Sequence, residues 1–376
     1  MMQNKKYMLD ALKLAARGVG SIEPNPAVGC VIVKGGQIIG KGFHEQFGGP
    51  HAEINALNDC RNLGANPKGG TMYVTLEPCC HIGKTGPCTR AIIDAGITKV
   101  IAAMLDPSQH ACGQGFEKLK QAGIEVEVGL CEEQAKILNA PFIKFATASR
   151  TWVTLKWAQT IDGKLAWASK TERWISSEQS RKDVQKLRGS SQAVLVGIQT
   201  VLNDDPQLTH RDAKNPNTKL LRVILDNKLR IPLDCKIVKT AKDHPVLVVT
   251  YEGSANSNPE KTHQLQNAGV EILTFGDLQN KSNLVFMLDE LSRRKIPRLL
   301  VESGPKVIAS FLREKLADEL CVYIAPKILG SAGTADISQT LTDLKKAITL
   351  HHIETKIFIG DTRIKGLTSH GLAAVS

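Results

Sequence analysis

Apolar and polar positions alternate along the first part of the chain in blocks that predict strands and helices in turn. A helical pattern covers residues 52–59, and β-rich runs at 71–76 and 99–105 indicate strands. Gly35-Gly36 separates a Val-rich run from an Ile-rich run and therefore predicts a hairpin. This alternation is typical of a layered α/β domain.

The pattern changes near residue 148, where a polar stretch precedes a β-rich run that starts at Trp152. Short apolar runs of the kind found in buried parallel strands then recur at 193–197, 223–226, 246–250 and 299–301. We therefore predict two domains, 1–147 and 148–376, the second with a parallel-rich sheet. Within it we expect a loop carrying Thr200 and Asp204, a strand-to-helix joint at Gly304-Pro305, one closing strand near the end and a frayed last ten residues.

Composition narrows the class of protein. At 376 residues the chain is long enough for two domains, and no apolar run approaches the roughly 20 residues that span a membrane. The N-terminus lacks a signal-peptide core, so we expect a cytoplasmic protein. Nine cysteines without a regular framework favour reduced thiols and a metal site. The net charge of +11 favours small phosphorylated partners, because no aromatic-interleaved basic stripe indicates nucleic acid.

The strongest chemical signal is His51-Ala52-Glu53 followed by Pro78-Cys79 and, nine positions after Cys79, by Cys88. One imidazole and two thiolates form a three-ligand zinc site with an open position for water, and a nearby glutamate can move protons. This is the signature of zinc-dependent deaminases, whose usual form closes with Cys-x-x-Cys. Cys79 and Cys80 are both ligand candidates, and we prefer Cys79 because it follows Pro78. The plainer alternative is a set of ordinary buried cysteines beside a loop histidine.

Several motifs together resemble the deaminase half of the bifunctional riboflavin-biosynthesis deaminase/reductase family. They are Asn25-Pro26-x-Val28-Gly29, His51-Ala52-Glu53, Glu77-Pro78-Cys79-x-His81, Pro87-Cys88 and Asp106-Pro107. The resemblance implies a cytidine-deaminase-like three-layer α/β/α fold, zinc on His51, Cys79 and Cys88, and Glu53 as the catalytic proton shuttle. Asn25, His81 and Lys84 are candidates for substrate contact, with plain loop residues as the equal alternative. Cys80 stands where the family usually has serine.

The second half resembles the reductase half of the same family, which has a dihydrofolate-reductase-like fold and uses NADPH. The motifs are Asp162-Gly163-Lys164, Trp174, Leu187-Arg188, Asp204-Asp205-Pro206, Glu302-x-Gly304-Pro305 and Tyr323-Ile324-Ala325-Pro326-Lys327. The resemblance implies cofactor contacts at Ala158, Trp174, Thr200, Asp204, Gly304 and Pro305, and substrate contacts at Arg188, Leu208, Arg211 and Glu302. Guanidinium groups suit phosphate oxygens, although single arginines are often surface charges. Glu172 replaces a small serine and would repel a phosphate.

The resemblance implies a bifunctional enzyme. Its first domain would hydrolytically deaminate 2,5-diamino-6-ribosylamino-4(3H)-pyrimidinone 5′-phosphate at zinc, and its second would reduce the ribosyl side chain to ribityl with NADPH, in a homo-oligomer. The alternative is a zinc deaminase acting on a nucleic-acid base or nucleoside, with a C-terminal binding module. The long cysteine loop and the aromatic content of 5% count against that alternative. A purely structural zinc domain leaves Glu53 unexplained.

Overall fold

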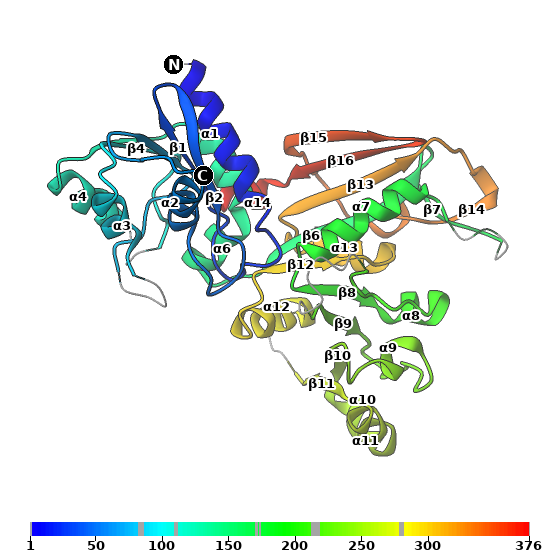
Figure 1. Ribbon diagram of the computed structural model, residues 1–376. Coiled ribbons are helices and arrows are strands. Elements are labelled where there is room, and N and C mark those ends of the chain that lie inside the picture. The colour runs from blue at the N-terminus through cyan, green and yellow to red at the C-terminus, as the bar shows by residue number, and fades with distance from the viewer. Residues whose placement is uncertain are drawn as a thin grey trace. The chain divides into compact units, whose positions relative to one another are not determined.

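The computed structural model of the 376-residue chain describes residues 2–81, 86–108, 112–169, 172, 174–211, 219–277 and 282–375. It divides into two compact units, Met1–Ser149 and Arg150–Ala374 (Figure 1). No helix in the described part of the chain combines the length and the apolar character that crossing a membrane requires.

Unit 1 is built on a five-stranded sheet in the order β2-β1-β3-β4-β5. β1 pairs antiparallel with β2 and β3, whereas β3, β4 and β5 run parallel. The predicted hairpin is confirmed, since Gly35 and Gly36 join β1 to β2 with φ of 57° and 77°, which suit glycine. The elements are β1 (Gly29–Lys34), β2 (Gln37–Phe43), β3 (Thr71–Val74), β4 (Lys99–Ala102), β5 (Glu125–Val128), α1 (Met2–Ala15), α2 (Ala52–Asn62), α3 (Cys88–Asp94), α4 (Gln114–Gln121), α5 (Glu132–Leu138) and α6 (Ala140–Ala148).

Helices cover both faces of this sheet. Met72 and Val74 of β3 belong to an apolar core shared with residues of α2, α3 and α4. Tyr73 lies between them in sequence and points to the opposite face, where its hydroxyl donates to Asn4 Oδ1 of α1 at 2.8 Å. The predicted three-layer α/β/α arrangement follows from this alternation.

Unit 2 contains a nine-stranded sheet in the order β11-β10-β9-β8-β12-β6-β13-β16-β15. Its strands run parallel except at β16, which is antiparallel to both β13 and β15. The strands are β6 (Trp152–Thr160), β8 (Ala193–Gly197), β9 (Leu221–Leu225), β10 (Val246–Tyr251), β11 (Val270–Phe275), β12 (Arg298–Val301), β13 (Glu319–Ala325), β15 (His351–Phe358) and β16 (Asp361–Leu367), with a separate pair of β7 (Lys164–Trp167) and β14 (Gly333–Asp336).

The helices of unit 2 lie on both faces of its central strands. Leu195 of β8 packs in one core with α12 and α13, while the adjacent Val194 and Val196 pack in a second core with α8, α9 and α11. The predicted buried parallel strands are therefore confirmed. The helices are α7 (Glu178–Gly189), α8 (Ile198–Asp204), α9 (Lys236–Lys239), α10 (Glu252–Asn256), α11 (Pro259–Asn267), α12 (Asn283–Arg293), α13 (Pro305–Arg313) and α14 (Ser369–Ala373), with short 3₁₀ turns at Gly330–Ala332 and Ser338–Thr340.

Two predictions about unit 2 are wrong. Thr200 and Asp204 do not lie in a loop but in α8, which starts directly after β8 and buries Ile198 and Val201. The end of the chain holds two strands, β15 and β16, and the helix α14 in place of one strand and a frayed tail. Thr368 caps α14 by accepting from the amide of Gly371, so the last turn is fixed.

Candidate active sites

Two glycines of β2 set the position of the helix that carries the deaminase motif. A Cβ on Gly42 would lie 2.4 Å from the carbonyl oxygen of Ala52, and one on Gly40 would lie 2.5 Å from that of Ala56. Glycine therefore lets α2 pack directly on the strand. His51 is the N-cap residue of α2 and Glu53 lies in its first turn, so both side chains project from a fixed helix start.

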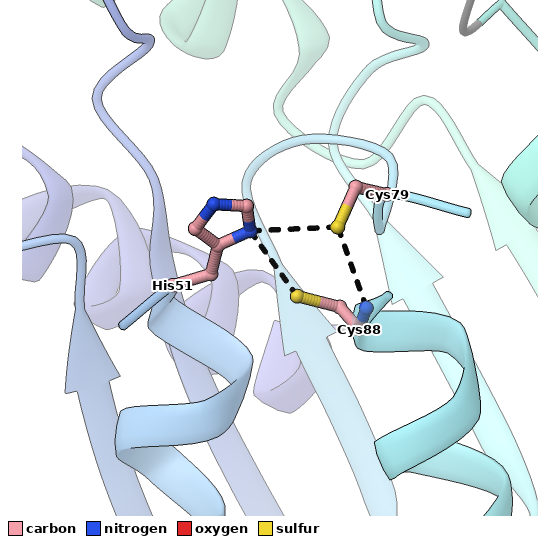
Figure 2. Close-up of side chains that lie close together, drawn as sticks. All are labelled: His51, Cys79 and Cys88. Carbon is pink, nitrogen blue, oxygen red and sulfur yellow. Dashed lines mark hydrogen bonds between the residues drawn. The ribbon is translucent and has the colours of Figure 1, made fainter. Parts of the chain in front are cut away.

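His51, Cys79 and Cys88 meet at one point (Figure 2). His51 Nδ1 lies 3.4 Å from Cys79 Sγ and 3.3 Å from Cys88 Sγ, and the Cys88 amide donates to Cys79 Sγ at 3.3 Å. Tetrahedral zinc bonds of about 2.1 Å to nitrogen and 2.3 Å to sulfur separate such a pair by about 3.6 Å. The three side chains fit zinc, and among the described residues no fourth His, Cys, Asp or Glu joins the group. Cys80 lies outside the group, with its Sγ 3.9 Å from Gln114 Oε1.

The electrostatics of this cluster suit metal binding and proton transfer. Hydrogen bonding to the Cys88 side chain, and then to His51, holds the pKa of Cys79 well below its usual value, so a thiolate ligand forms readily. Glu53 is 3% exposed, and burial together with the nearby Cys79 raises the pKa of its carboxyl to about 7. A carboxyl with such a pKa can accept and return a proton near neutral pH.

Other polar groups of unit 1 surround the cluster. Asn25, a predicted substrate contact, has its Nδ2 3.2 Å from Nε2 of His44, whose ring stacks edge-on against His51 at 5.4 Å. His81 is exposed, and Lys84 lies outside the described residues. Asn25 therefore contacts His44, and His44 in turn contacts the metal-site residue His51.

Glu77 has a structural role that the sequence analysis did not assign. Its buried carboxylate accepts from the amides of Asp106, Gly113 and Gly115 at 3.2, 2.9 and 2.8 Å. Glu77 therefore ties the segments after β4 to the end of β3, next to Cys79. Its place directly before Pro78 was the only sequence signal.

In unit 2, two predicted substrate residues bind each other. Arg188, at the end of α7, contacts Glu302 through Nε–Oε1 at 2.6 Å and Nη2–Oε2 at 3.2 Å. Lys156 of β6 lies 3.5 Å from the same carboxylate. Burial disfavours the charge on Glu302, but Arg188 and Lys156 outweigh it and hold its pKa below the ordinary value. We name this largely buried set, Lys156, Arg188 and Glu302, the ion triad. The sequence analysis missed Lys156.

The other predicted substrate residues follow in the segment beside α7. Arg188 Nη1 donates to the carbonyl of Thr209 at 3.3 Å, next to the buried Leu208, whose φ is 54°. Arg211 is exposed, and its amide donates to Gln185 of α7 at 3.2 Å. Glu172 is exposed as well. The structure thus brings Arg188 and Glu302 together and places Leu208 and Arg211 along α7.

Four of the six predicted cofactor residues lie in or at the start of two helices, α8 and α13. Gly304 caps α13 and Pro305 is its first residue, while Thr200 and Asp204 lie in α8 at the end of the neighbouring strand β8. A Cβ on Gly304 would meet nothing within 4 Å, so its backbone is open to a ligand. A cleft of about 430 Å³ lies beside α8 and α13 and includes Lys228, Arg230 and Lys306.

The other two predicted cofactor residues are Ala158 and Trp174. Ala158 lies in the middle of β6, opposite Tyr323 of β13. Trp174 is 51% exposed, with the guanidinium of Arg181 over its ring at 4.8 Å. Ala158 therefore lies in a strand and Trp174 in the segment between β7 and α7, and neither belongs to α8 or α13.

Comparisons with known proteins agree with both halves. Residues 1–104 match the cytidine and deoxycytidylate deaminase zinc-binding region, and residues 151–357 match the RibD C-terminal domain. The riboflavin biosynthesis protein RibD of Aquifex aeolicus is 44% identical over 351 residues, which cover 92% of this chain and 95% of that protein.

Solved structures agree over nearly the full length. RibD of Acinetobacter baumannii (form 1) has 37% identity and a TM-score of 0.81, with 98% of this chain and 99% of that chain covered. A Thermotoga maritima diaminohydroxyphosphoribosylaminopyrimidine deaminase/5-amino-6-(5-phosphoribosylamino)uracil reductase has 36% identity, the same coverage and a TM-score of 0.83. The predicted cytidine-deaminase-like and dihydrofolate-reductase-like folds are thereby confirmed. The chain belongs to the RibD family of bifunctional riboflavin-biosynthesis proteins, with a zinc-dependent deaminase domain followed by an NADPH-dependent reductase domain.

Proposed function

We propose that this chain deaminates 2,5-diamino-6-ribosylamino-4(3H)-pyrimidinone 5′-phosphate and then reduces the ribosyl side chain of the product to ribityl. The observation that carries the first step is the convergence of His51, Cys79 and Cys88 beside the buried Glu53. The printed name of the Thermotoga maritima relative describes the same two reactions and supports the substrate assignment.

His51, Cys79 and Cys88 would hold the zinc in unit 1. When bound, zinc supplies the Lewis acidity that makes water a nucleophile at neutral pH. Glu53 would take a proton from that water and deliver it to the pyrimidine ring nitrogen as the hydroxide adds to the ring carbon. It would then take the proton of the added hydroxyl group and deliver it to the amino group, which leaves as ammonia while the carbonyl forms. The raised pKa of Glu53 suits this role, because the same carboxyl group both accepts and donates a proton. We propose that the pair Asn25–His44 orients the pyrimidine, a role supported by the contact of the His44 ring with His51.

NADPH supplies the hydride for the second step. We propose that the start of α13 at Gly304-Pro305, together with α8, holds the phosphates of the cofactor, since helix N-termini and nearby cations attract anions. The ion triad would hold the substrate, with Arg188 and Lys156 available to the pyrimidine or its phosphate and Glu302 orienting both cations. Leu208, Arg211, Ala158 and Trp174 remain predicted contacts of the same domain.

We also propose that residues 1–147 carry the deaminase and residues 148–376 the reductase. A cytoplasmic location and a homo-oligomer stay predictions from the sequence.

The proposal is tested with zinc-loaded protein and the diaminopyrimidine ribosylamino phosphate, by following ammonia release and NADPH oxidation separately. We expect Lys156→Met to slow NADPH oxidation at least about tenfold, the effect of roughly one lost charged contact, and to leave ammonia release unchanged. Equal loss of both signals would contradict the assignment of Lys156 to the reductase alone. Absence of both signals in the zinc-loaded wild type would contradict the substrate assignment.

A further inference from the structure

Arg222 is a charged side chain in the core of unit 2. It lies in β9, between β8 and β10 (Figure 1), and is 0% exposed. Like Ile224, two positions later in the strand, it points to the face of the sheet that α8, α9 and α11 cover. Burial lowers the pKa of its guanidinium to about 10, which leaves the group charged at neutral pH. Among the described residues no carboxylate pairs with it, so this buried charge needs another explanation.

The guanidinium of Arg222 binds two separate segments of the chain. Its Nη1 donates to the carbonyl of Gln207 at 3.1 Å and to Thr240 Oγ1 at 2.8 Å. Its Nη2 donates to the carbonyls of Thr240 and His244 at 3.1 and 2.6 Å. In the described part of the chain, no backbone amide donates to the Gln207 carbonyl. Arg222 therefore ties the segment that follows α8 to the residues that follow α9.

The segment around Gln207 has an unusual backbone. Asp205 and Leu208 have φ of 41° and 54°, and neither is glycine. Leucine rarely adopts this left-handed conformation, because its Cβ approaches the following carbonyl, and such residues persist where their surroundings hold them. The amide of Lys236 donates to Asp205 Oδ1 at 2.8 Å, and Arg222 holds Gln207. We call residues 205–208 the corner, which is thus held from outside at two points.

The corner separates predicted contacts of the two ligands of the reductase. Asp204, a predicted cofactor contact, is the last residue of α8 and directly precedes the corner. Leu208, within the corner, and Arg211, three positions after it, are predicted substrate contacts. A change in the backbone of the corner would therefore move Leu208 and Arg211 relative to Asp204. Hydride transfer depends on such alignment, because small displacements of reacting groups slow a reaction strongly.

We propose that Arg222 is a positioning residue of the reductase, which fixes the corner and thereby sets Leu208 and Arg211 in place for the pyrimidine substrate. The inference rests on the function proposed above for unit 2. Because Arg222 is fully buried, it acts through the corner and not by touching the substrate. Arginine suits this role, since its planar group offers several donors in fixed directions and stays charged when buried, whereas lysine offers one ammonium group.

The first test measures NADPH oxidation by full-length Arg222→Lys with the deaminated intermediate as substrate. We expect the KM for this pyrimidine to rise at least about tenfold, the effect of roughly one lost charged hydrogen bond. The KM for NADPH should change by less than about threefold, because α8 and α13 keep their own packing, and ammonia release should be unchanged.

Thr151→Val is the matched control. Thr151 is 2% exposed, and its hydroxyl donates to the carbonyl of Ile296 at 2.8 Å, at the start of β6. This variant also loses a buried hydrogen bond of unit 2, so it should lower the Tm without changing either KM. An unchanged pyrimidine KM in Arg222→Lys, or an equal rise in Thr151→Val, overturns the proposal.

Hydrogen exchange examines the corner without any turnover. We expect the backbone amides of residues 205–211 to exchange at least about tenfold faster in Arg222→Lys than in the wild type, and Thr151→Val to leave them unchanged. Thr240→Val removes one acceptor of the same guanidinium and keeps its charge, so it should give a smaller change of the same kind and serves if Arg222→Lys does not fold. Unchanged exchange in both Arg222→Lys and Thr240→Val overturns the role of Arg222. A wild type that does not oxidise NADPH with the intermediate contradicts the proposed function itself.

Discussion

Replacing Glu302 by glutamine perturbs the ion triad at its centre. Its side chain is 8% exposed, and that of Arg188 is 13% exposed. Glutamine keeps the shape but removes the negative charge, so two cations are left in a buried position with one neutral partner. Removing one member of a buried pair costs about 3–5 kcal/mol.

This cost predicts a measurable shift in melting temperature. A domain of 150–250 residues changes its Tm by about 2–4 °C per kcal/mol, so Glu302→Gln is expected to lower the Tm of unit 2 by roughly 6–20 °C. Differential scanning calorimetry measures the Tm of this transition. The rate of NADPH oxidation should also be lower in the variant, while ammonia release should persist. The reasoning depends on burial, because an identical change at an exposed pair costs little.

Glu271→Gln is the matched control for this prediction. Glu271 also pairs with an arginine of unit 2, but its side chain is 54% exposed. Exposed pairs contribute about 0–1 kcal/mol, so the control is expected to shift the Tm by less than about 4 °C. A Glu302→Gln protein that melts no lower than the Glu271→Gln protein would refute the stabilising part assigned to the triad.

Two further predictions concern pH and the metal. The pKa of Glu302 is held below its ordinary value, so the contribution of this carboxylate to stability is complete above the unfolded pKa of about 4.5 and is lost as the pH falls through the folded pKa. Below about pH 5, the Tm of the wild type should therefore fall more steeply with decreasing pH than the Tm of Glu302→Gln. Parallel curves of Tm against pH would contradict the assignment. Cys79→Ser and Cys88→Ser are each expected to lower bound zinc from about one per chain to near zero, while Cys80→Ser retains it, as measured by elemental analysis after dialysis. Loss of zinc in the Cys80 variant alone would reverse the choice between the adjacent thiols.

Local motifs allowed much of unit 1 to be predicted. His51 and Glu53 are two positions apart at a helix start, and Pro78-Cys79 lies just after a strand, so residue type and position together indicated a metal site. The Cys79 or Cys80 alternative could not be decided from spacing. The side-chain direction distinguishes them, since Cys80 faces Gln114 and Cys79 faces His51.

The ion triad shows what sequence analysis could not supply. Lys156, Arg188 and Glu302 lie far apart in sequence and meet because β6 and β12 are neighbours and α7 covers that face. Strand order is a tertiary property, so the motif search identified Arg188 and Glu302 separately, did not foresee their pairing, and passed over Lys156. The prediction of a loop at Thr200 was wrong for a local reason. The N-cap residue of α8 is Gly197, so no polar capping residue marks the start of the helix in the sequence.

The most direct test of the bifunctional account uses Glu53→Gln with two substrates. We predict that the variant retains zinc, releases ammonia from the diaminopyrimidine about 10²–10⁴-fold more slowly than the wild type, and oxidises NADPH at the wild-type rate when given the deaminated intermediate. This result would place Glu53 in the first reaction and leave the second intact. NADPH oxidation with the diaminopyrimidine at the wild-type rate, despite the loss of ammonia release, would contradict the order of the two reactions, and unchanged ammonia release would contradict the part assigned to Glu53.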